Sequence, residues 1–343
     1  MKKWFEHSGS DGDIIISSRI RLARNLTAKP FPSQADHKAA YEIVAAVTGA
    51  MERLGAAFEG FEKVDLSADR LGIYSRSLVE KHLISAEFAA SEKPRALFLS
   101  KDQAISIMVN EEDHIRLQAL GSGLCLGPIY DLADKIDDLL DESLGFAFDE
   151  RLGYLTECPT NLGCGMRASV MMHLPALTES GQIGRFINAA GKLGIAVRGI
   201  YGEGSEAQGA IYQISNSFTL GFSEREIIEQ LSSTVGNIIA DERRLRENMR
   251  ENAPAFEDRI YRSRALLASA RLLGTREAMA LISNLRLGLG LEGFPDIATL
   301  NSLLWEIQPA SLSLGREAIP DAQTRDVLRA EVARATLGRD LEI

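Results

Sequence analysis

The chain has few cysteines and no long apolar run, and both absences exclude classes of protein. Its three cysteines, Cys125, Cys158 and Cys164, are odd in number and lack the spacing of zinc ligands. We therefore expect neither a disulfide framework nor a protein-bound metal. No apolar stretch approaches the length of a membrane span, and the opening segment MKKWFEHSGSDGD lacks the apolar core of a secretory signal. We expect a cytoplasmic protein without a membrane partner.

Positive charge is also in deficit. Lysine and arginine number 38 against 48 aspartates and glutamates, which leaves a net charge of −10 over 343 residues. Because a nucleic-acid backbone requires a basic face, we expect no direct nucleic-acid partner. An acidic surface instead attracts a basic macromolecule through long-range steering. The length allows two domains, and 45% hydrophobic residues with 25% charged residues are typical of a globular protein.

Hydrophobic periodicity divides the chain into two parts. In the first part, strands are predicted for DIIISSRIRLARN, RALFLS, ISIMVNEEDHIRLQAL, IAVRGIY and GAIYQISN. Helical patterns alternate with them over residues 34–54, 77–87, 130–143, 177–193 and 223–252. From Ala255 onward, helical spacing continues with breaks near Gly274, 288–293 and Pro320. We predict an α+β catalytic domain over 1–252, with a core at 14–244, followed by a small all-helical domain over 253–343.

Five arginines in the first part lie beside small or polar residues: Arg19, Arg21, Arg116, Arg167 and Arg198. A fold that gathered them would create strong repulsion unless a polyanion filled the space between them. The planar guanidinium stays ionised and donates in pairs to phosphate oxygens. The arginines together therefore favour a nucleotide-phosphate site. Each one alone is equally consistent with a solvated side chain or a local ion pair with glutamate.

Two acidic segments accompany the arginines. NEEDHIR, residues 110–116, places three carboxylates side by side, where they repel one another. This segment alone is either a solvated turn or part of a site. RGIYGEGSEAQG, residues 198–209, carries Glu203 and Glu206 among glycines, which allow backbone to approach a ligand and a loop to close over it. The two segments together favour a site.

The segment CPTNLGCGMRASV, residues 158–170, is the most specific pattern. Its proline, asparagine and glycines predict a loop, and we expect Arg167 to open a helix through His173 whose N-terminal amides bind phosphate. Cys158 lies on this loop with Arg167 nearby in sequence, and such surroundings lower a thiol pKa. A buried free thiol is the alternative for any cysteine, and Cys125 is expected to be one.

These motifs carry a family resemblance. SSRIR, NEEDHIR, CPTNLGCGMRASV and RGIYGEGSEAQGAIYQISN, in this order and spacing, resemble the ATP:guanidino phosphotransferase (phosphagen kinase) family over about residues 14–244, and within it the bacterial protein arginine kinases. The resemblance implies an antiparallel β-sheet flanked by helices. It also implies an enzyme that uses ATP and Mg²⁺ to phosphorylate a guanidinium group.

The resemblance further implies roles for individual residues. Glu112 and Glu203 would be the paired carboxylates that bind the acceptor, and Cys158 the reactive cysteine. His82 matches a nucleotide-side histidine, although a surface helix histidine fits equally well. Cys164 replaces a threonine common in relatives, which leaves that contact open. The implied nucleotide site comprises Ser17, Ser18, Arg19, Ile20, Arg21, His82, Arg116, Arg167, Ala168, Ser169, Val170, Met171, Arg198, Gly199, Ile200, Tyr201, Gly202 and Glu203.

The chemistry explains why two carboxylates are needed. A guanidinium group is protonated near neutral pH and its lone pairs are delocalised, so it is a poor nucleophile. A carboxylate pair orients one nitrogen toward the γ-phosphate and accepts its proton as the N–P bond forms. Arginines and Mg²⁺ then offset the charge of the transferring phosphoryl group.

The acceptor is predicted to be arginine within a protein. SSRIR lies near the start of the sequence, so we expect no N-terminal helical domain of the kind that encloses small substrates in kinases for free arginine or creatine. RDVLRA matches an RDxxRA motif of protein arginine kinases. The match implies an allosteric phosphoarginine site formed by Arg325, Asp326, Val327, Leu328, Arg329 and Ala330. An arginine pair at this spacing is otherwise a solvated helix face. A kinase for a free guanidino compound and a non-catalytic phosphoarginine-binding adaptor are the alternatives.

The resemblance also implies partners and a role in the stress response. Protein substrates would include a stress-gene repressor and misfolded proteins marked for a Clp-type protease, and a zinc-binding protein would activate the enzyme. An apolar stripe in the C-terminal part either packs on the catalytic domain or forms a homodimer interface. It consists of Leu266, Leu267, Ala270 and Leu273.

Overall fold

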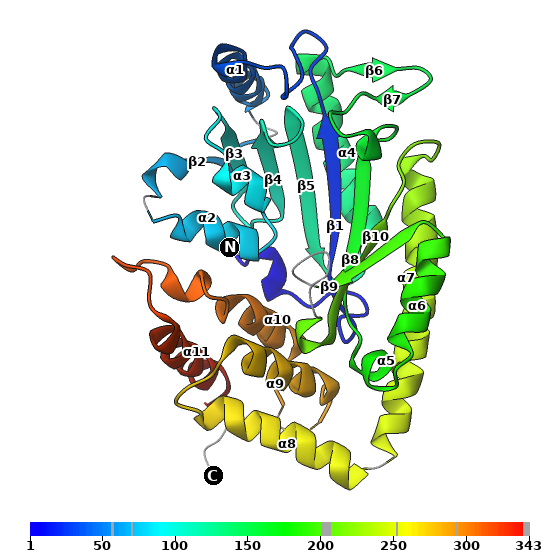
Figure 1. Cartoon of the computed structure of the whole chain (residues 1–343), viewed down its shortest axis with the longest axis vertical. Coiled ribbons are helices and arrows are strands. Elements are labelled where there is room, and N and C mark those ends of the chain that lie inside the picture. Colours follow the sequence, from blue (N-terminus) through cyan, green and yellow to red (C-terminus); the bar gives the residue numbers. More distant parts are fainter. Residues whose placement is uncertain (56–57, 70, 200–206, 252, 292–293, 339–343) are drawn as a thin grey trace.

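An antiparallel sheet of eight strands runs through the upper part of the molecule (Figure 1). The computed structural model describes residues 1–343 except 56–57, 70, 200–206, 252, 292–293 and 339–343. The strand order is β2-β3-β4-β5-β1-β8-β10-β9, and neighbouring strands pair antiparallel. The strands are β1 (Ile15–Arg24), β2 (Phe61–Val64), β3 (Ala96–Ser100), β4 (Ile105–Val109), β5 (Ile115–Ser122), β8 (Met166–His173), β9 (Ile195–Gly199) and β10 (Ile211–Asn216). A separate hairpin joins β6 (Phe148–Asp149) to β7 (Gly153–Tyr154).

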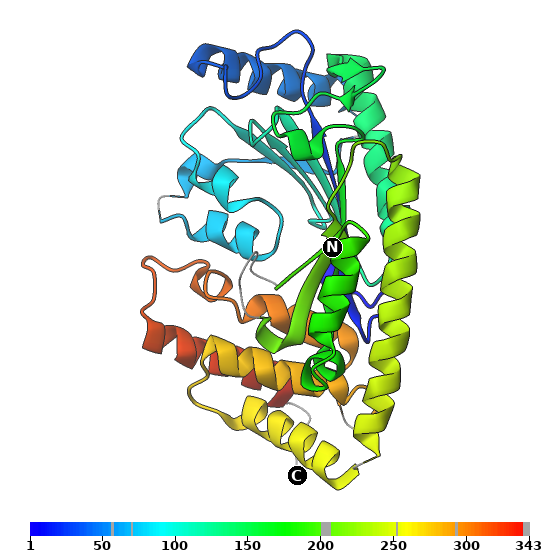
Figure 2. The same ribbon diagram turned by 45° about the vertical axis from the view of Figure 1, so that its right-hand side comes forward.

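Helices cover both faces of this sheet. Figure 2 shows α4 and α7 on one side and α2, α3 and the C-terminal helices on the other. The helices are α1 (His37–Arg53), α2 (Ile73–Glu80), α3 (Ala86–Ala90), α4 (Leu126–Leu144), α5 (Pro175–Glu179), α6 (Ile183–Lys192), α7 (Glu224–Arg250), α8 (Ala253–Ser269), α9 (Thr275–Leu287), α10 (Ile297–Glu306) and α11 (Ala322–Leu337). The predicted α+β class with an antiparallel sheet is confirmed. None of the helices in the described part combines the length and apolarity needed to cross a bilayer.

Polar side chains start several of these helices. Asp36 and Asp321 each accept a hydrogen bond from the backbone amide three residues later, at the first turns of α1 and α11. Ser223 begins α7 with a capping box, because Glu226 bonds back to the Ser223 amide. These caps satisfy amides that a helix leaves without an internal partner.

The predicted helix over residues 167–173 is wrong, because this segment is strand β8. It pairs with β1 on one side and with β10 on the other. The short apolar run ASVMM fits a buried strand as well as a helix, so pairing on both sides decides its structure. Arg167 therefore does not lie at a helix N-terminus, and no helix amides bind phosphate there.

Two other predicted helices are interrupted. The helix predicted over 77–87 is replaced by α2, which begins earlier, and the short α3. Between them His82 adopts a φ of 57°, a left-handed conformation that ends the helix. The helix predicted over 177–193 breaks near Gly181, whose φ of 70° separates α5 from α6.

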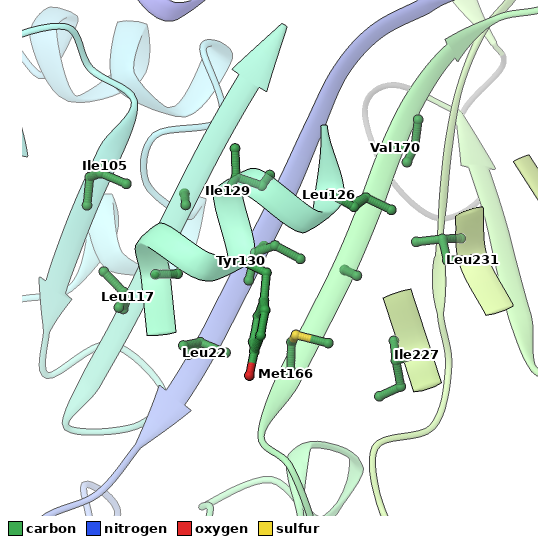
Figure 3. Close-up of a cluster of buried hydrophobic side chains, with 14 of the residues drawn as sticks. Leu22, Ile105, Leu117, Leu126, Ile129, Tyr130, Met166, Val170, Ile227 and Leu231 are labelled. Atoms are coloured by element: carbon green, nitrogen blue, oxygen red, sulfur yellow. The ribbon is translucent and has the colours of Figure 1, made fainter. Parts of the chain in front are cut away.

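One apolar core fills the space between the sheet and helices α1, α4 and α7. Ile20 and Leu22 alternate along β1 with Arg19 and Arg21. The two aliphatic side chains therefore point into this core, and the two arginines point away from it. Figure 3 shows Leu22 among residues of neighbouring strands, α4 and α7. Burial of one such side chain stabilises the fold by roughly 2 kcal/mol.

A second core lies against the opposite face and includes the C-terminal helices. Leu120 and Met171 of the sheet belong to the same cluster of buried side chains as Trp305 of α10 and Trp4 near the N-terminus. The rings of Trp4 and Trp305 lie 5.8 Å apart. Part of this sheet face is therefore covered by apolar packing.

The apolar stripe predicted in the C-terminal part divides between core and surface. Leu267 and Leu273 are fully buried in the second core and Ala270 packs against it, whereas Leu266 is 47% exposed. The stripe therefore packs mainly inside this chain.

A buried polar network joins the sheet to helices α7 and α9. Arg246 donates to Nδ1 and to the carbonyl oxygen of His173, and Nε2 of His173 lies 2.7 Å from Oγ of Ser283. Since Nδ1 accepts a hydrogen bond from Arg246, the neutral imidazole carries its proton on Nε2 and donates a hydrogen bond from there to the Ser283 hydroxyl. Burial, followed by the charge of Arg246, holds the pKa of His173 well below its usual range.

Candidate active site

The sheet register gathers the predicted arginines on one face. Arg21 of β1 lies directly opposite Arg167 of β8, and Arg116 of β5 lies opposite Ala23, two residues along β1. Opposed residues in a sheet point to the same face, and so do residues two positions apart. Arg19 shares this face. Arg198 of β9 also lies on this face, because it is opposite Gln213 of β10, which is in turn opposite Met171 of β8. It is two strands away from β8.

This arrangement is electrostatically unfavourable without an anion. Loss of solvation, followed by the charges of Arg167 and Arg116, lowers the pKa of Arg19 to about 10. Loss of solvation and three neighbouring arginines likewise lower the pKa of Arg21. Nε of Arg21 is buried and makes no hydrogen bond to any described residue. Guanidinium donors that converge in this way are suited to a multiply charged anion such as a triphosphate.

A cavity of about 180 Å³ opens over the arginines. Arg21, Arg116 and Arg167 line it together with the carboxylate residue Glu112 and the loop residue Asn161. A narrower hollow continues along the same face of the sheet. Its lining comprises Trp4, Ser17, Arg19, His82, Leu120, Ser169, Met171 and Gln213.

His82 belongs to this hollow rather than to a surface helix. Its left-handed backbone is held by Gln118, whose Nε2 donates to the His82 carbonyl oxygen over 2.6 Å. Its ring packs edge-on against Trp305, with ring centres 5.6 Å apart. Loss of solvation, followed by the charges of Arg19 and Arg21, lowers the pKa of His82 to about 3, so the ring is neutral at neutral pH.

The NEEDHIR segment forms the turn between β4 and β5 and brings two carboxylates to Arg116. Nη1 of Arg116 lies 2.8 Å from Glu111, and Nη2 lies 2.6 Å from Glu112. Glu112 also accepts a hydrogen bond from Asn161 and is 40% exposed, so it can reach a ligand. Glu203, its predicted partner, lies outside the described residues.

Glu111 is a site residue that the sequence did not single out. It is almost fully buried, and one of its oxygens accepts both from Arg116 and from the Ser85 hydroxyl, the latter over 2.6 Å. Three adjacent carboxylates give no indication of which one faces inward. The third, Asp113, is fully buried and accepts from Asn25 and from the Glu157 amide, so it holds the loop.

The predicted reactive cysteine lies at the edge of the site. Cys158 is half-buried, and its Sγ lies 3.0 Å from the Thr160 hydroxyl, which lines the arginine cavity. Cys164 points into the first apolar core, where burial raises its thiol pKa to about 11. Burial also raises the pKa of Cys125. The three cysteines are free thiols in the structure.

Four residues predicted to contact nucleotide have side chains on the opposite face of the sheet. Ile20, Ala168 and Val170 lie in the first apolar core. The Ser18 hydroxyl donates to the Gly123 carbonyl oxygen and accepts from the Cys125 amide. Strand alternation places every second side chain of a contiguous motif away from the ligand. Gly199 ends β9, whereas Ile200, Tyr201 and Gly202 lie outside the described residues.

The RDVLRA segment lies on α11, which Figure 1 shows in the lower part of the molecule, below the sheet. Arg329 is fully buried and donates to the carbonyl oxygens of Leu273 and Ile307 and to Asp326. Its guanidinium thus joins the ends of neighbouring helices. Arg325 is half-buried and donates to the Pro320 carbonyl oxygen. Val327 and Leu328 are half-buried and Ala330 is buried.

Two family models and several curated proteins match this chain. The model for the ATP:guanido phosphotransferase C-terminal catalytic domain matches residues 42–245, and that for the protein-arginine kinase McsB C-terminal domain matches residues 253–342. The protein-arginine kinase of Caldanaerobacter subterraneus is 44% identical over 336 residues, which cover 96% of this chain and 98% of that protein. The protein-arginine kinase of Symbiobacterium thermophilum is 46% identical over 339 residues, 98% of this chain and 96% of that protein.

A solved structure shares the fold. The duplicated taurocyamine kinase from Schistosoma mansoni, with bound transition state analog components, aligns with a TM-score of 0.61 at 26% sequence identity. The alignment covers 68% of this chain and 33% of that chain.

Proposed function

Because this chain belongs to the ATP:guanido phosphotransferase family, we propose that it transfers the γ-phosphate of ATP to arginine side chains of proteins. The observation that carries the proposal is the arginine cluster on one sheet face with the exposed carboxylate of Glu112 at its edge. The identity to protein-arginine kinases over nearly the whole chain supports a protein acceptor.

The arginine cluster is suited to the triphosphate of ATP. Arg19, Arg21, Arg116 and Arg167 would donate to phosphate oxygens and offset the charge that develops during transfer. Neutral His82 would border the nucleotide without adding to the repulsion among the arginines. We propose that Arg198 and the RGIYGE segment contact the same nucleotide and complete its pocket.

The acceptor guanidinium would bind at Glu112. Arg116 and Asn161 hold this carboxylate, so it can orient one guanidinium nitrogen toward the γ-phosphorus. As the new N–P bond forms, the bond from the γ-phosphorus to the bridging oxygen of ADP breaks, and the nitrogen loses its proton to the carboxylate. We propose Glu203 as the second carboxylate that binds the acceptor guanidinium. We also propose Cys158, at the edge of the arginine cavity, as the reactive cysteine.

The residues also fit Mg²⁺ that arrives with ATP. Within the part of the chain that the structure describes, no group of three or more ligating side chains is present, whereas Glu111 and Glu112 stand beside the cluster. Mg²⁺ commonly binds phosphates and waters with only one or two carboxylates. When bound, it would neutralise charge on the phosphate oxygens.

The regulatory and cellular roles are proposals that rest on the family. We propose that phosphoarginine binds at Arg325 and Asp326, because the Arg329 guanidinium is occupied by backbone carbonyl oxygens. We further propose a cytoplasmic homodimer in the stress response, which marks a stress-gene repressor and misfolded proteins for a Clp-type protease with the help of a zinc-binding activator.

An acceptor assay tests the proposed function. The purified chain is incubated with ATP and Mg²⁺ and either a basic protein or free arginine, and acid-labile phosphate is measured on each. We expect phosphate on the protein acceptor. Phosphate on free arginine alone would indicate a kinase for a small guanidino compound, and phosphate on neither acceptor would support a binding adaptor.

A further inference from the structure

An exposed apolar groove lies on the far side of the loop that borders the arginine cavity. Its walls are formed by Phe148 and Leu152 of the β6–β7 hairpin and by Leu220 and Phe222 before α7. These four side chains are between 44% and 59% exposed, and the groove has a volume of about 310 Å³. An apolar surface of this kind on a globular protein commonly marks a binding site.

Both walls of the groove contact Gly163 of the loop over residues 160–165, which borders the arginine cavity. The Tyr154 amide of the hairpin donates to the Gly163 carbonyl oxygen over 2.8 Å. On the other side, a Cβ atom at Gly163 would lie 2.6 Å from the Thr219 carbonyl oxygen, so this close approach requires glycine. The Thr219 hydroxyl also donates to the carbonyl oxygens of Thr160 and Leu162.

The same loop therefore has two functional sides. Thr160, Asn161 and Gly165 line the arginine cavity, and Gly163 and Cys164 line the apolar groove. Asn161 donates to Glu112, which is the proposed acceptor carboxylate. Asn161, which bonds to Glu112, and Gly163, which lines the groove, are two residues apart on this loop. Because consecutive residues of an extended chain advance by roughly 3.3 Å, a polypeptide with its arginine at Glu112 would reach the groove within a few residues.

The hairpin wall is held by side-chain packing. The Phe148 and Tyr154 rings pack edge-to-face at 5.2 Å, and the Arg24 guanidinium lies 3.5 Å from the Tyr154 ring centre. Arg24 is buried and pairs with Asp137 over 2.7 Å. An apolar wall held in place in this way binds a side chain without first having to be ordered.

We propose that this groove binds apolar side chains of the acceptor polypeptide near its target arginine, an inference that rests on the proposed function. The occupant is an extended, arginine-bearing segment of a protein. Its positive charge is complementary to the net charge of −10 of this chain. Folded proteins bury most apolar side chains, so the groove selects arginines in unfolded segments.

Peptide kinetics test the inference. One synthetic peptide carries a single arginine with leucines a few positions away, a second carries serines in their place, and N-acetyl-arginine amide is the minimal acceptor. With the wild-type chain we expect the KM of the leucine peptide to be about tenfold below that of the serine peptide. Leu220→Ser and, in the opposite wall, Phe148→Ser should each remove this difference. Neither should change kcat or the KM of the minimal acceptor.

Matched controls lie in the C-terminal part, on α8 and in the connection between α8 and α9. Leu266→Ser and Leu272→Ser change side chains of comparable exposure, 47% and 56%, and should preserve the preference for leucine. Equal KM values for both peptides with the wild-type chain would show that the groove does not bind the acceptor polypeptide, but would leave the proposed function intact. No phosphorylation of any acceptor would overturn both. If Leu220→Ser converts a dimer to a monomer in sedimentation equilibrium and peptide preference persists, the groove is an interface between copies, and the inference is wrong.

Discussion

Arg21 of β1 and Arg167 of β8 form a directly opposed pair of like charges in the register of the sheet. Such a pair destabilises a sheet by up to about 1 kcal/mol. Both residues line the same cavity as Arg116. The fold therefore maintains an unfavourable arrangement that a bound polyanion relieves.

Replacement of one member of this pair should separate stability from nucleotide binding. We expect Arg21→Gln to raise the melting temperature of the nucleotide-free protein by about 2 °C, because it removes repulsion. The same variant should lose most of the stabilisation that ATP gives the wild type. Differential scanning fluorimetry with and without ATP measures both effects. Arg262→Gln, at an exposed position, is the control. A variant that melts earlier yet keeps the full ATP shift would contradict the expectation.

The carboxylate at the acceptor edge should act on turnover rather than on ATP affinity. Glu112→Gln keeps the shape of the side chain but removes the proton acceptor, so kcat should fall by about 100-fold or more. The Kd for ATP should stay within about threefold, because Arg116 remains paired with Glu111. Steady-state kinetics and calorimetric titration with ATP provide the two measurements. Glu142→Gln, on the exposed side of α4, should change neither, and near-normal turnover in Glu112→Gln would remove this residue from the mechanism.

The link between the sheet and the C-terminal helices should be acid-sensitive. The pKa of His173 is lowered in the folded protein, and the ordinary value in the unfolded chain is 6.5. Its contribution to stability is therefore complete above pH 6.5 and is lost as the pH falls below that value, by up to about 1.4 kcal/mol per pH unit. Urea unfolding at several pH values should show a shallower decline for His173→Gln. Exposed His7 supplies the control, His7→Gln, which should retain the wild-type slope.

The two arginines of RDVLRA should behave differently on replacement. Arg329→Gln leaves the Leu273 and Ile307 carbonyl oxygens without a buried donor, so the free energy of unfolding should fall by about 3 kcal/mol. Arg325→Gln should cost less than about 1 kcal/mol but weaken phosphoarginine binding. Chemical denaturation and titration with phosphoarginine measure these outcomes. Unchanged phosphoarginine affinity in a folded Arg325→Gln variant would exclude Arg325 from the regulatory site.

Local pattern predicted much of the fold. Alternation along SSRIR predicts a strand with Arg19 and Arg21 on one face, and β1 has this arrangement. Helical spacing after Ala255 likewise predicts a series of helices with a break near Gly274, and in the structure Gly274 is the N-cap of α9. These features depend on residues close in sequence, which explains why the sequence was sufficient to predict them.

Contacts between distant segments decided the rest. The ASVMM run forms a strand because β1 and β10 flank it, and neither partner can be inferred from the run itself. Glu111 faces Arg116 because the Ser85 hydroxyl, from a distant segment of the chain, donates a hydrogen bond to its carboxylate. Arg329 is buried because carbonyl oxygens at the ends of other helices converge on it.

The amino-acid sequence by itself determined the chemical groups of this protein: the arginines for phosphate, the carboxylates for a guanidinium group and the family to which they belong. Only the tertiary structure decided which of those groups share a face. Strand register places Arg21 opposite Arg167 and turns Ile20 and Val170 away from them. Register is set by pairing across the whole sheet, and a single segment of sequence does not contain its partners.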